Sequence, residues 1–321
     1  MQSRVRRDGD AMKRKVRRVL FILSFILIPV VHFLVFYVYV NFDSLLLSFQ
    51  TIKGGELTFC AFDNFKRVFD RIAQSGLEGI AGGPQDLGLA FRNTFITFGI
   101  TVLLFPIGML VSYFIYKKIV GYKVFRVLFY LPAIISPIVM AFFYSQILQD
   151  GTFMTDFILY LTGKPKGTVP LTNNELSNAM VLAQVVWLGI PNNMILWSGA
   201  FARIPDSIVE SARMDGAGWV REMFQMILPL VWPTFVLLVI TSIANCFGAT
   251  GSVFLLTSGD YGTQTLSNWM YMQVQTASAA GRLDNALTLV SAMGVMISVI
   301  AITVALLVRK FLTSRIEEVQ Y

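Results

Sequence analysis

The sequence predicts an all-α membrane protein that crosses the bilayer six times and carries a short polar helix between its fourth and fifth spans. Composition is the first observation behind this prediction: the 321 residues are 55% hydrophobic and only 14% charged, with a mean hydropathy of +0.64. One soluble core cannot bury so much apolar surface at this chain length. The second observation is a series of apolar runs of about 20 residues, the length that a helix needs to cross about 30 Å of hydrocarbon.

Six apolar runs are long enough to span the membrane. The first is longer than the apolar core of a signal peptide and has no small-residue cleavage pattern, so we expect it to be retained as a span. The predicted organisation is a basic N-terminus (1–18), a first span with an external loop (19–92), the main transmembrane domain (93–308) and a tail (309–321). The six runs are Val19–Val40, Asn93–Tyr116, Val127–Leu148, Ala179–Ala200, Pro229–Leu256 and Ala286–Val308.

Lysine and arginine are unequally distributed among the connecting segments. Eighteen of the 26 lie in residues 1–18, in the segments after the second and fourth spans, and in the tail. Because basic residues near span ends accumulate on the cytoplasmic side, both termini and Glu210 are expected in the cytoplasm. Lys53, Lys166 and Asp260 are then expected outside. The net charge of +7 indicates membrane orientation, and no nucleic acid partner is predicted from it.

Three external segments are expected, roughly Asn41–Arg92, Gln149–Asn178 and Thr257–Asn285. The first contains "SGLEGIAGGPQDLG", whose glycines and proline are typical of a loop. None of the three has a periodic pattern long enough for a core of its own, so no second soluble domain is predicted. Cys60 is expected outside and Cys246 inside the fifth span, and this difference in depth argues against a disulfide.

The sequence lacks the usual motifs of catalytic sites and of nucleotide-binding sites. The single histidine, His32, is too little for a metal site or a histidine-based triad. "LTGKPKGT" lacks the first glycine of a phosphate-binding loop, so the chain is predicted to bind no ATP. No nucleophile–base pair or metal cluster can be assembled from the sequence either, so we expect no cofactor in this chain and no enzymatic activity. The spans carry no ionisable residue away from their ends other than His32, which weighs against an ion-coupled secondary carrier. Sodium carriers can use backbone and hydroxyl oxygens instead, so such a carrier stays as the alternative function.

The stretch "RIPDSIVESARMDGAG", residues 203–218, interrupts the apolar pattern between the fourth and fifth spans. Pro205 suits the first turn of a helix, and Gly216 suits a left-handed end. Ile208 and Ala212 share a face because they are four residues apart. A helix of about two turns is too short to be stable alone in water, so it needs a docking partner. An ordinary surface helix that joins two spans is the other interpretation.

Three short matches, two in this stretch and one shortly after it, carry a family resemblance. Glu210-Ser211-Ala212, Asp215-Gly216-Ala217 and Leu228-Pro229 resemble the E-A-A…D-G-A…L-P coupling-loop signature of binding-protein-dependent ABC importer permeases. "WLGIPNNMILWSGAFARIP", "FRVLFYLPAIISPIVMAFFYSQIL" and "TSGDYGTQTLSNWMY" resemble the maltose-type sugar permeases. The resemblance covers roughly Arg92 to Lys310. Ser211 replaces an alanine and Met226 an isoleucine, and both exchanges preserve residue character.

The resemblance implies a permease subunit in the bacterial cytoplasmic (inner) membrane that forms half of a saccharide pathway. The implied partners are a second homologous permease, two ABC subunits that bind ATP and magnesium, and an external solute-binding protein. A membrane-embedded enzyme is not implied. The residues expected to couple to the ATPase subunit are Glu210, Ser211, Ala212, Asp215, Gly216 and Ala217.

The resemblance also places the solute pathway on the fourth and fifth spans. Asparagine offers a donor and an acceptor and serine a rotatable hydroxyl, which suits a neutral, hydroxyl-rich saccharide. Bridging between helices is the alternative role for such asparagines. The matching positions are Leu188, Gly189 and Asn192 on the fourth span and Ser242, Asn245 and Cys246 on the fifth.

Further expectations concern the surroundings of this pathway. Gly189 and Pro191 are expected to interrupt the hydrogen bonds of the fourth helix. An acidic saccharide or glycerol phosphate is the alternative solute, and Arg92 and Arg282 or the partner permease would then have to neutralise it. Aromatic faces for a sugar ring are expected from three residues if they point inward: Trp187, Trp197 and Tyr144.

Overall fold

The computed structural model describes residues 2–53, 56–78, 86–248, 251–279 and 283–314 of the chain. It divides into two compact units, Met1–Val68 with Asp284–Val295, and Phe69–Leu283 with Met296–Tyr321. The strands found in the described ranges form one antiparallel hairpin, and helices account for most of the rest. The predicted all-α fold class is therefore confirmed.

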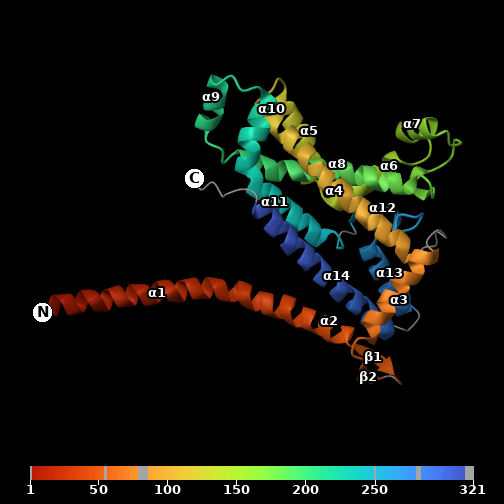
Figure 1. Ribbon diagram of the computed structural model, residues 1–321, viewed down its shortest axis with the longest axis horizontal. Coiled ribbons are helices and arrows are strands. Elements are labelled where there is room, and N and C mark those ends of the chain that lie inside the picture. Colours follow the sequence, from red (N-terminus) through yellow and green to blue (C-terminus); the bar gives the residue numbers. More distant parts are fainter. Residues whose placement is uncertain (1, 54–55, 79–85, 249–250, 280–282, 315–321) are drawn as a thin grey trace. The chain divides into compact units, whose positions relative to one another are not determined.

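A long helical segment opens the first unit. α1 (Gln2–Phe33) continues through a π-helical turn, η1 (Leu34–Tyr39), into α2 (Val40–Ser48) (Figure 1). The stretch Arg17–Ser48 is long and apolar enough to cross a membrane. Its apolar side chains are exposed, as expected for a span whose neighbours are lipid or another subunit.

A small hairpin follows α2 where the sequence predicts only a loop. β1 (Gln50–Lys53) pairs with β2 (Glu56–Phe59), and α3 (Asp63–Glu78) begins four residues later. The buried Asn64 side chain donates from Nδ2 to the carbonyl oxygens of Ser48 at 3.1 Å and Gln50 at 2.7 Å. The sequence predicts an external loop here and neither the hairpin nor the helix, which the two hydrogen bonds of Asn64 connect to the end of α2. Residues 79–85, the glycine-rich part of the predicted loop, lie outside the described residues.

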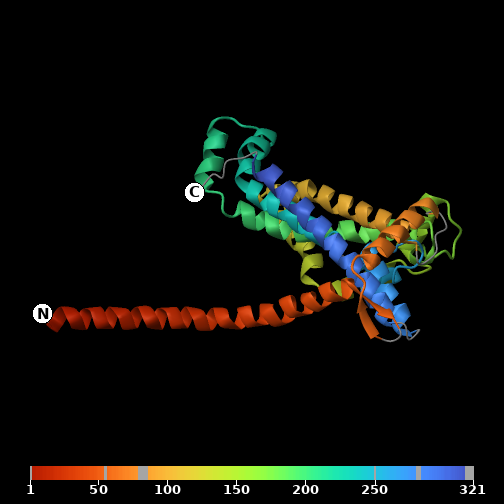
Figure 2. The same ribbon diagram turned by 60° about the horizontal axis from the view of Figure 1, so that its bottom comes forward.

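α4 (Leu87–Tyr116) and α8 (Ser177–Phe201) pack side by side in the second unit (Figures 1 and 2). A Cβ atom added at Gly189 of α8 would lie 2.5 Å from Leu104 Cδ1 of α4, so a larger residue there would force the Leu104 side chain to shift. α11 (Leu228–Asn245) packs against both helices. Their shared core includes the buried residues Phe105, Met109, Tyr113, Trp197, Phe201, Met223, Ile227 and Val231.

Shorter elements complete the second unit, and both α3 and α14 (Leu283–Thr313) have residues in each unit. The shorter elements are α5 (Tyr122–Ile134), α6 (Pro137–Ile147), α7 (Phe153–Thr162), η2 (Pro170–Thr172), α9 (Asp206–Met214), α10 (Trp219–Arg221), η3 (Glu222–Ile227), α12 (Gly251–Thr257) and α13 (Leu266–Ala279).

Five described helices have the length and composition of membrane spans, and the number rises to six if the bent pair α5 and α6 counts as one. The predicted third span, Val127–Leu148, is wrong as a single helix, since α5 and α6 meet at an angle of 104°. Ile135 and Ser136 adopt extended backbone there, and the residue before a proline is restricted to that region by steric clash with the ring of Pro137.

The fifth span is shifted toward the N-terminus relative to the prediction, since the helical apolar stretch runs over Trp219–Asn245. α11 ends at Asn245, and α12 is a separate helix that ends at Thr257, whereas the apolar pattern predicts one span to Leu256. Hydropathy alone does not distinguish the two helices because both are apolar. Residues 249–250, which lie between them, are outside the described residues.

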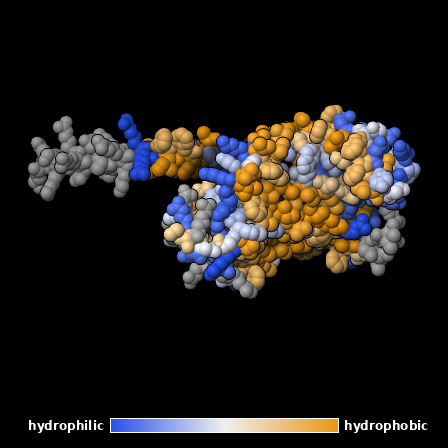
Figure 3. All heavy atoms as spheres, turned by 90° about the horizontal axis from the view of Figure 1, so that it is seen from above, coloured by the Kyte–Doolittle hydropathy of each residue, from blue (hydrophilic) through white to orange (hydrophobic). Residues whose placement is uncertain are grey.

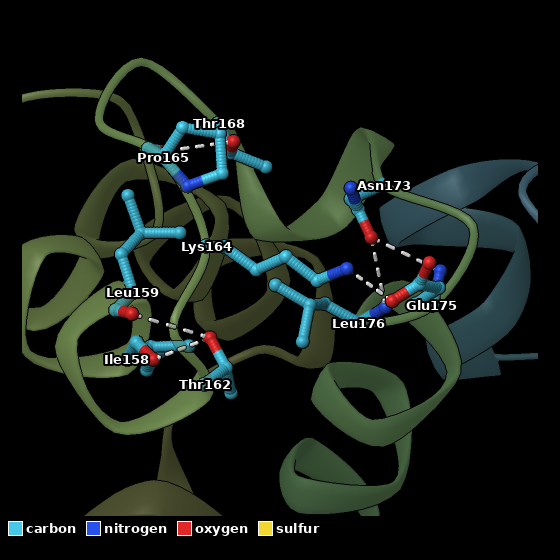
Figure 4. Close-up of polar contacts among 9 residues, drawn as sticks. All are labelled: Ile158, Leu159, Thr162, Lys164, Pro165, Thr168, Asn173, Glu175 and Leu176. Atoms are coloured by element: carbon cyan, nitrogen blue, oxygen red, sulfur yellow. Dashed lines mark hydrogen bonds and ion pairs between the residues drawn. The ribbon is translucent and has the colours of Figure 1, made fainter.

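Local polar contacts organise the connection between α7 and α8 (Figure 4). The Asn173 carboxamide oxygen accepts from the backbone N–H groups of Glu175 at 3.0 Å and Leu176 at 3.2 Å. Lys164 forms an ion pair with Glu175, and the Thr162 hydroxyl donates to the carbonyl oxygen of Ile158 at 2.7 Å. This connection is therefore an ordered loop.

Hydrophobic side chains cover much of the surface visible in Figure 3. The exposed apolar side chains of α5 and α6 include Val127, Leu128, Ile138 and Phe142. An apolar surface of this extent is unfavourable in water. It fits helices that are surrounded by lipid.

Candidate functional site

The polar segment between α8 and α11 contains α9, a helix of nine residues. Pro205 directly precedes it, and Gly216 follows it with φ of +68°, so both predicted helix boundaries are present. The Ala217 N–H donates to the Ala212 carbonyl oxygen at 3.0 Å and closes the last turn. Glycine is needed at position 216 because other residues rarely adopt this left-handed backbone.

α9 has two different faces. Val209 and Ala212 are buried within this chain, and Ala212 is only 1% exposed. Val209 packs into the core that contains Tyr113 and Met223. Ala212, which the sequence groups with residues that meet a partner, therefore lies on the inner face.

The outer face of α9 is polar apart from one large apolar side chain. Met214 is 88% exposed, next to the exposed Asp215 and Gly216. The sequence analysis missed Met214, although an apolar residue between two charged ones in a polar loop is a recognisable signal. Of the six predicted coupling residues, four are exposed and Ala217 is half-buried; the exposed ones are Glu210, Ser211, Asp215 and Gly216.

The chain after α9 is attached to the C-terminal end of α4. Lys117 Nζ lies 2.7 Å from each carboxylate oxygen of Glu222, at the start of η3. The Lys117 side chain is 18% exposed and the Glu222 side chain 3%. The Tyr113 hydroxyl donates to the Trp219 carbonyl oxygen at 3.5 Å, and the Phe114 and Trp219 rings lie 5.6 Å apart.

A cavity of about 240 Å³ lies among α4, α8 and α11. It combines hydroxyl and amide groups with two aromatic rings. Asn193 Nδ2 is buried and has no hydrogen-bond partner within the described part of the chain. A buried donor of this kind is costly unless a ligand or water satisfies it. The lining residues are Thr97, Phe98, Thr101, Phe105, Asn193, Leu196, Leu238, Thr241, Ser242, Asn245 and Cys246.

The cavity contains half of the residues predicted for the solute pathway. Ser242, Asn245 and Cys246 line it, whereas Leu188, Gly189 and Asn192 do not. Gly189 instead permits the contact with α4, and Asn192 is exposed on α8. The structure adds two threonines of α4, Thr97 and Thr101. Their i, i+4 spacing within an apolar run was a signal for this polar face.

The aromatic and helix-breaking expectations for α8 are corrected. α8 is continuous from Ser177 to Phe201, so neither Gly189 nor Pro191 ends the helix, although Pro191 lacks an N–H and cannot donate to the carbonyl oxygen of Trp187. Trp197 is buried, and its Nε1 donates to the Phe105 carbonyl oxygen of α4 at 3.1 Å.

The other two aromatic residues pack on each other at a ring distance of 5.9 Å, and neither Trp187 nor Tyr144 lines the cavity. Phe98 and Phe105 are the aromatic residues of the lining instead. Arg92 is exposed, and Arg282 lies outside the described residues.

Known proteins with similar sequences are bacterial permeases. The arabinooligosaccharides transport system permease protein AraP of Bacillus subtilis is 23% identical over 285 residues, which cover 87% of this chain and 84% of that protein. The sn-glycerol-3-phosphate transport system permease protein UgpA of Yersinia pestis is 25% identical over 276 residues, 84% of this chain and 87% of that protein.

Two solved structures share the fold. A bacterial ABC transporter involved in the import of the acidic polysaccharide alginate matches with a TM-score of 0.72 at 20% identity, over 95% of this chain and 99% of the matched chain. A bacterial alginate ABC transporter in complex with an alginate pentasaccharide-bound periplasmic protein matches with a TM-score of 0.69 at 22% identity, over 92% and 94%.

A family model covers most of the transmembrane part. The model for the binding-protein-dependent transport system inner membrane component matches residues 104–318. This range includes α9, the contact of α9 with the core, and most of the cavity lining. The chain therefore belongs to this family of transport permeases, as a multi-pass protein of the bacterial inner membrane.

Proposed function

We propose that this chain forms half of the translocation pathway of an ATP-driven importer for a neutral saccharide. The observation that carries this proposal is the cavity among α4, α8 and α11, which is lined by hydroxyl and amide groups beside two aromatic rings. Sugars are recognised by such groups, because each sugar hydroxyl both donates and accepts and each ring has an apolar face. Family membership decides against an ion-coupled carrier.

The cavity size supports a second permease as partner. About 240 Å³ is less than the roughly 300–1,000 Å³ of a typical ligand pocket, so a saccharide needs additional space. A homologous permease beside this chain supplies the other wall. Asn192, exposed on α8, is then available to face the shared pathway.

The outer face of α9 is assigned the contact with an ABC subunit that hydrolyses ATP. Glu210, Ser211 and Asp215 provide polar contacts, and Met214 provides an apolar anchor. Gly216 holds the turn that presents them, while Val209 and Ala212 hold the helix against its own core. Two ATPase subunits, one for each permease, and an external solute-binding protein complete the proposed assembly.

The choice of a neutral saccharide follows from the lack of cationic side chains in the described lining of the cavity. Its lining, as far as the chain is described, includes no lysine, arginine or histidine. An anionic solute would need a cation there to offset the loss of its hydration. The solutes given in the names of UgpA and of the alginate transporter, glycerol phosphate and an acidic polysaccharide, are anionic. Anionic solutes are therefore the comparison to include in a test.

The test measures ATPase activity of the assembled transporter against neutral and anionic saccharides. Stimulation by a neutral oligosaccharide is expected, and Ser242→Ala or Thr101→Val should raise the half-maximal concentration by about fivefold, the effect of one hydrogen bond of about 1 kcal/mol. Thr303→Val, which removes an exposed hydroxyl of α14, is the matched control. Stimulation by anionic solutes alone, unchanged in both cavity variants, would refute the neutral saccharide and the pocket.

We further propose that α9 and both termini face the cytoplasm. The uneven distribution of basic residues supports this orientation. Single cysteines at Ser211 and Lys166, in a background without Cys60 and Cys246, test it. An impermeant thiol reagent added outside intact cells should label position 166 only, and labelling of position 211 alone would reverse the orientation.

A further inference from the structure

We infer that the Lys117–Glu222 ion pair is a positioning link through which α9 moves α4, and with α4 one wall of the solute cavity. The inference rests on the proposed function, because it concerns how movement at the ATPase contact reaches the solute. No motif in the sequence indicates this link, since the two residues are 105 positions apart. Neither residue lines the cavity or lies on the outer face of α9.

α4 is connected to the α9 segment by non-covalent contacts because of its place in the chain. α8 and α11 are joined covalently to the segment that contains α9, so both are pulled directly when α9 moves. α4 ends at Tyr116, ninety residues before α9 begins at Asp206. Yet α4 contributes Thr97, Thr101 and Phe105 to the cavity lining. For the three walls to move together, α4 has to be held by non-covalent contacts.

The ion pair is well suited to hold it. Lys117 contacts both oxygens of Glu222 at 2.7 Å, and the Glu222 side chain is almost fully buried. Separating the two would leave a buried carboxylate without a partner, which is strongly unfavourable. The segments that carry them are therefore expected to move as one body.

Neighbouring contacts reinforce the same junction. Lys117 Nζ lies 5.8 Å from the centre of the Tyr113 ring, a distance at which a cation is attracted to an aromatic face. Tyr113 also reaches the carbonyl oxygen of Trp219, whose ring packs against Phe114. The lysine end of the ion pair thus lies against an aromatic ring, and the backbone three residues before Glu222 is also bound to α4.

The helical path from this junction to the cavity is short and continuous. Phe105 precedes Lys117 by twelve residues on α4, which corresponds to about 18 Å along a helix. At Phe105 the carbonyl oxygen accepts the hydrogen bond from Trp197 of α8. A displacement at Lys117 therefore reaches the wall of the cavity through one helix.

The test uses the complete transporter reconstituted with its solute-binding protein. We compare Lys117→Met and Glu222→Gln with the charge-exchanged double variant Lys117→Glu/Glu222→Lys. The ratio of solute-stimulated to basal ATPase activity should fall about fivefold or more in the single variants, the range of a typical coupling between sites. The double variant should recover most of the ratio. Lys118→Met, an exposed neighbour with the same charge change, should match the wild type.

A reversible cross-link tests the link in protein that is already folded and assembled. Cysteines at positions 117 and 222, in the background without Cys60 and Cys246, are joined by a short bifunctional thiol reagent with a cleavable bond. The stimulation ratio should be normal while the cross-link is intact and should fall after cleavage. This comparison does not depend on whether the single variants fold.

The possible results separate the link from the proposed function. No solute stimulation in the wild-type transporter would contradict the proposed function itself. Normal wild-type stimulation that persists in Lys117→Met, in Glu222→Gln and after cleavage would refute the link alone. A normal ratio in the single variants cannot be reconciled with the inference, since the pair is then absent while coupling is present.

Discussion

Two lysine–glutamate pairs of the second unit show how surroundings change the role of the same chemical contact. Lys117 and Glu222 join segments 105 residues apart, and the glutamate side chain is 3% exposed. Lys164 and Glu175 join residues 11 apart in the loop between α7 and α8, and there the glutamate is 72% exposed. Water and salt screen the second pair, so it contributes little to stability. The first pair constrains two helices because neither charge can be left unpaired there.

The largest effect in this comparison is expected from Glu222→Leu. The change leaves the Lys117 ammonium group in a mostly buried site without its partner, which should destabilise the protein by about 3–5 kcal/mol. Thermal unfolding of the detergent-solubilised protein measures it. The matched change in the exposed pair, Glu175→Leu, should leave the melting temperature nearly unchanged, and equal shifts in the two variants would remove the distinction between the pairs.

Replacing both partners of the buried pair sharpens the comparison. Lys117→Met/Glu222→Leu removes both charges together, so no uncompensated charge remains. Stability should return to within about 1–2 kcal/mol of the wild type, because apolar residues of similar volume often replace a buried ion pair without loss. Unfolding of the single and double variants in parallel gives the coupling between the two sites. Additive losses would show that the residues act separately.

A smaller effect is expected at the backbone of the exposed loop. Asn173→Ala removes the acceptor for the N–H groups of Glu175 and Leu176, and the predicted loss is about 1 kcal/mol. Asn173→Asp keeps the acceptor and serves as the control. Hydrogen exchange of the two amides should speed up in the alanine variant only, and unchanged exchange there would mean that water replaces the side chain fully.

The smallest effect is expected from Lys164→Met in the exposed pair. The predicted loss is at most about 1 kcal/mol, and it should shrink further as the salt concentration rises. Melting temperatures at low and high salt measure it. A loss as large as that of Glu222→Leu, and independent of salt, would place the exposed pair in the same class as the buried one.

The spans and the boundaries of α9 could be predicted from the sequence because they are local properties. Apolar length predicts a span, and Pro205 and Gly216 mark helix ends through their own backbone preferences. The break between α5 and α6 also has a local cause, Pro137, but an apolar run conceals it. Whether a proline in a span bends or breaks the helix depends on its neighbours.

Long-range partners account for what the sequence did not predict. Ala212 is buried, as is Val209, which packs into the core, and the periodicity of nine residues does not show which face of the helix meets that core. The hairpin after α2 depends on Asn64, whose acceptors lie 14 and 16 residues earlier. Thr97 and Thr101 become cavity residues only because Ser242 and Asn245 face them from α11. The family resemblance pointed to the α11 residues of this cavity lining but to none of those on α4.

The division of α9 into two faces has a consequence for how such transporters are combined. Glu210, Ser211 and Met214 are exposed, and the Ser211 hydroxyl donates to the Ser207 carbonyl oxygen of the same helix, whereas Val209 and Ala212 are buried. An exchange of the three outward residues for those of another permease is therefore compatible with the same scaffold. On the proposed assignment of the outer face to an ATPase subunit, partner choice and scaffold stability would depend on different positions of a single helix, so an importer could acquire a different ATPase subunit without changes in its membrane-spanning core.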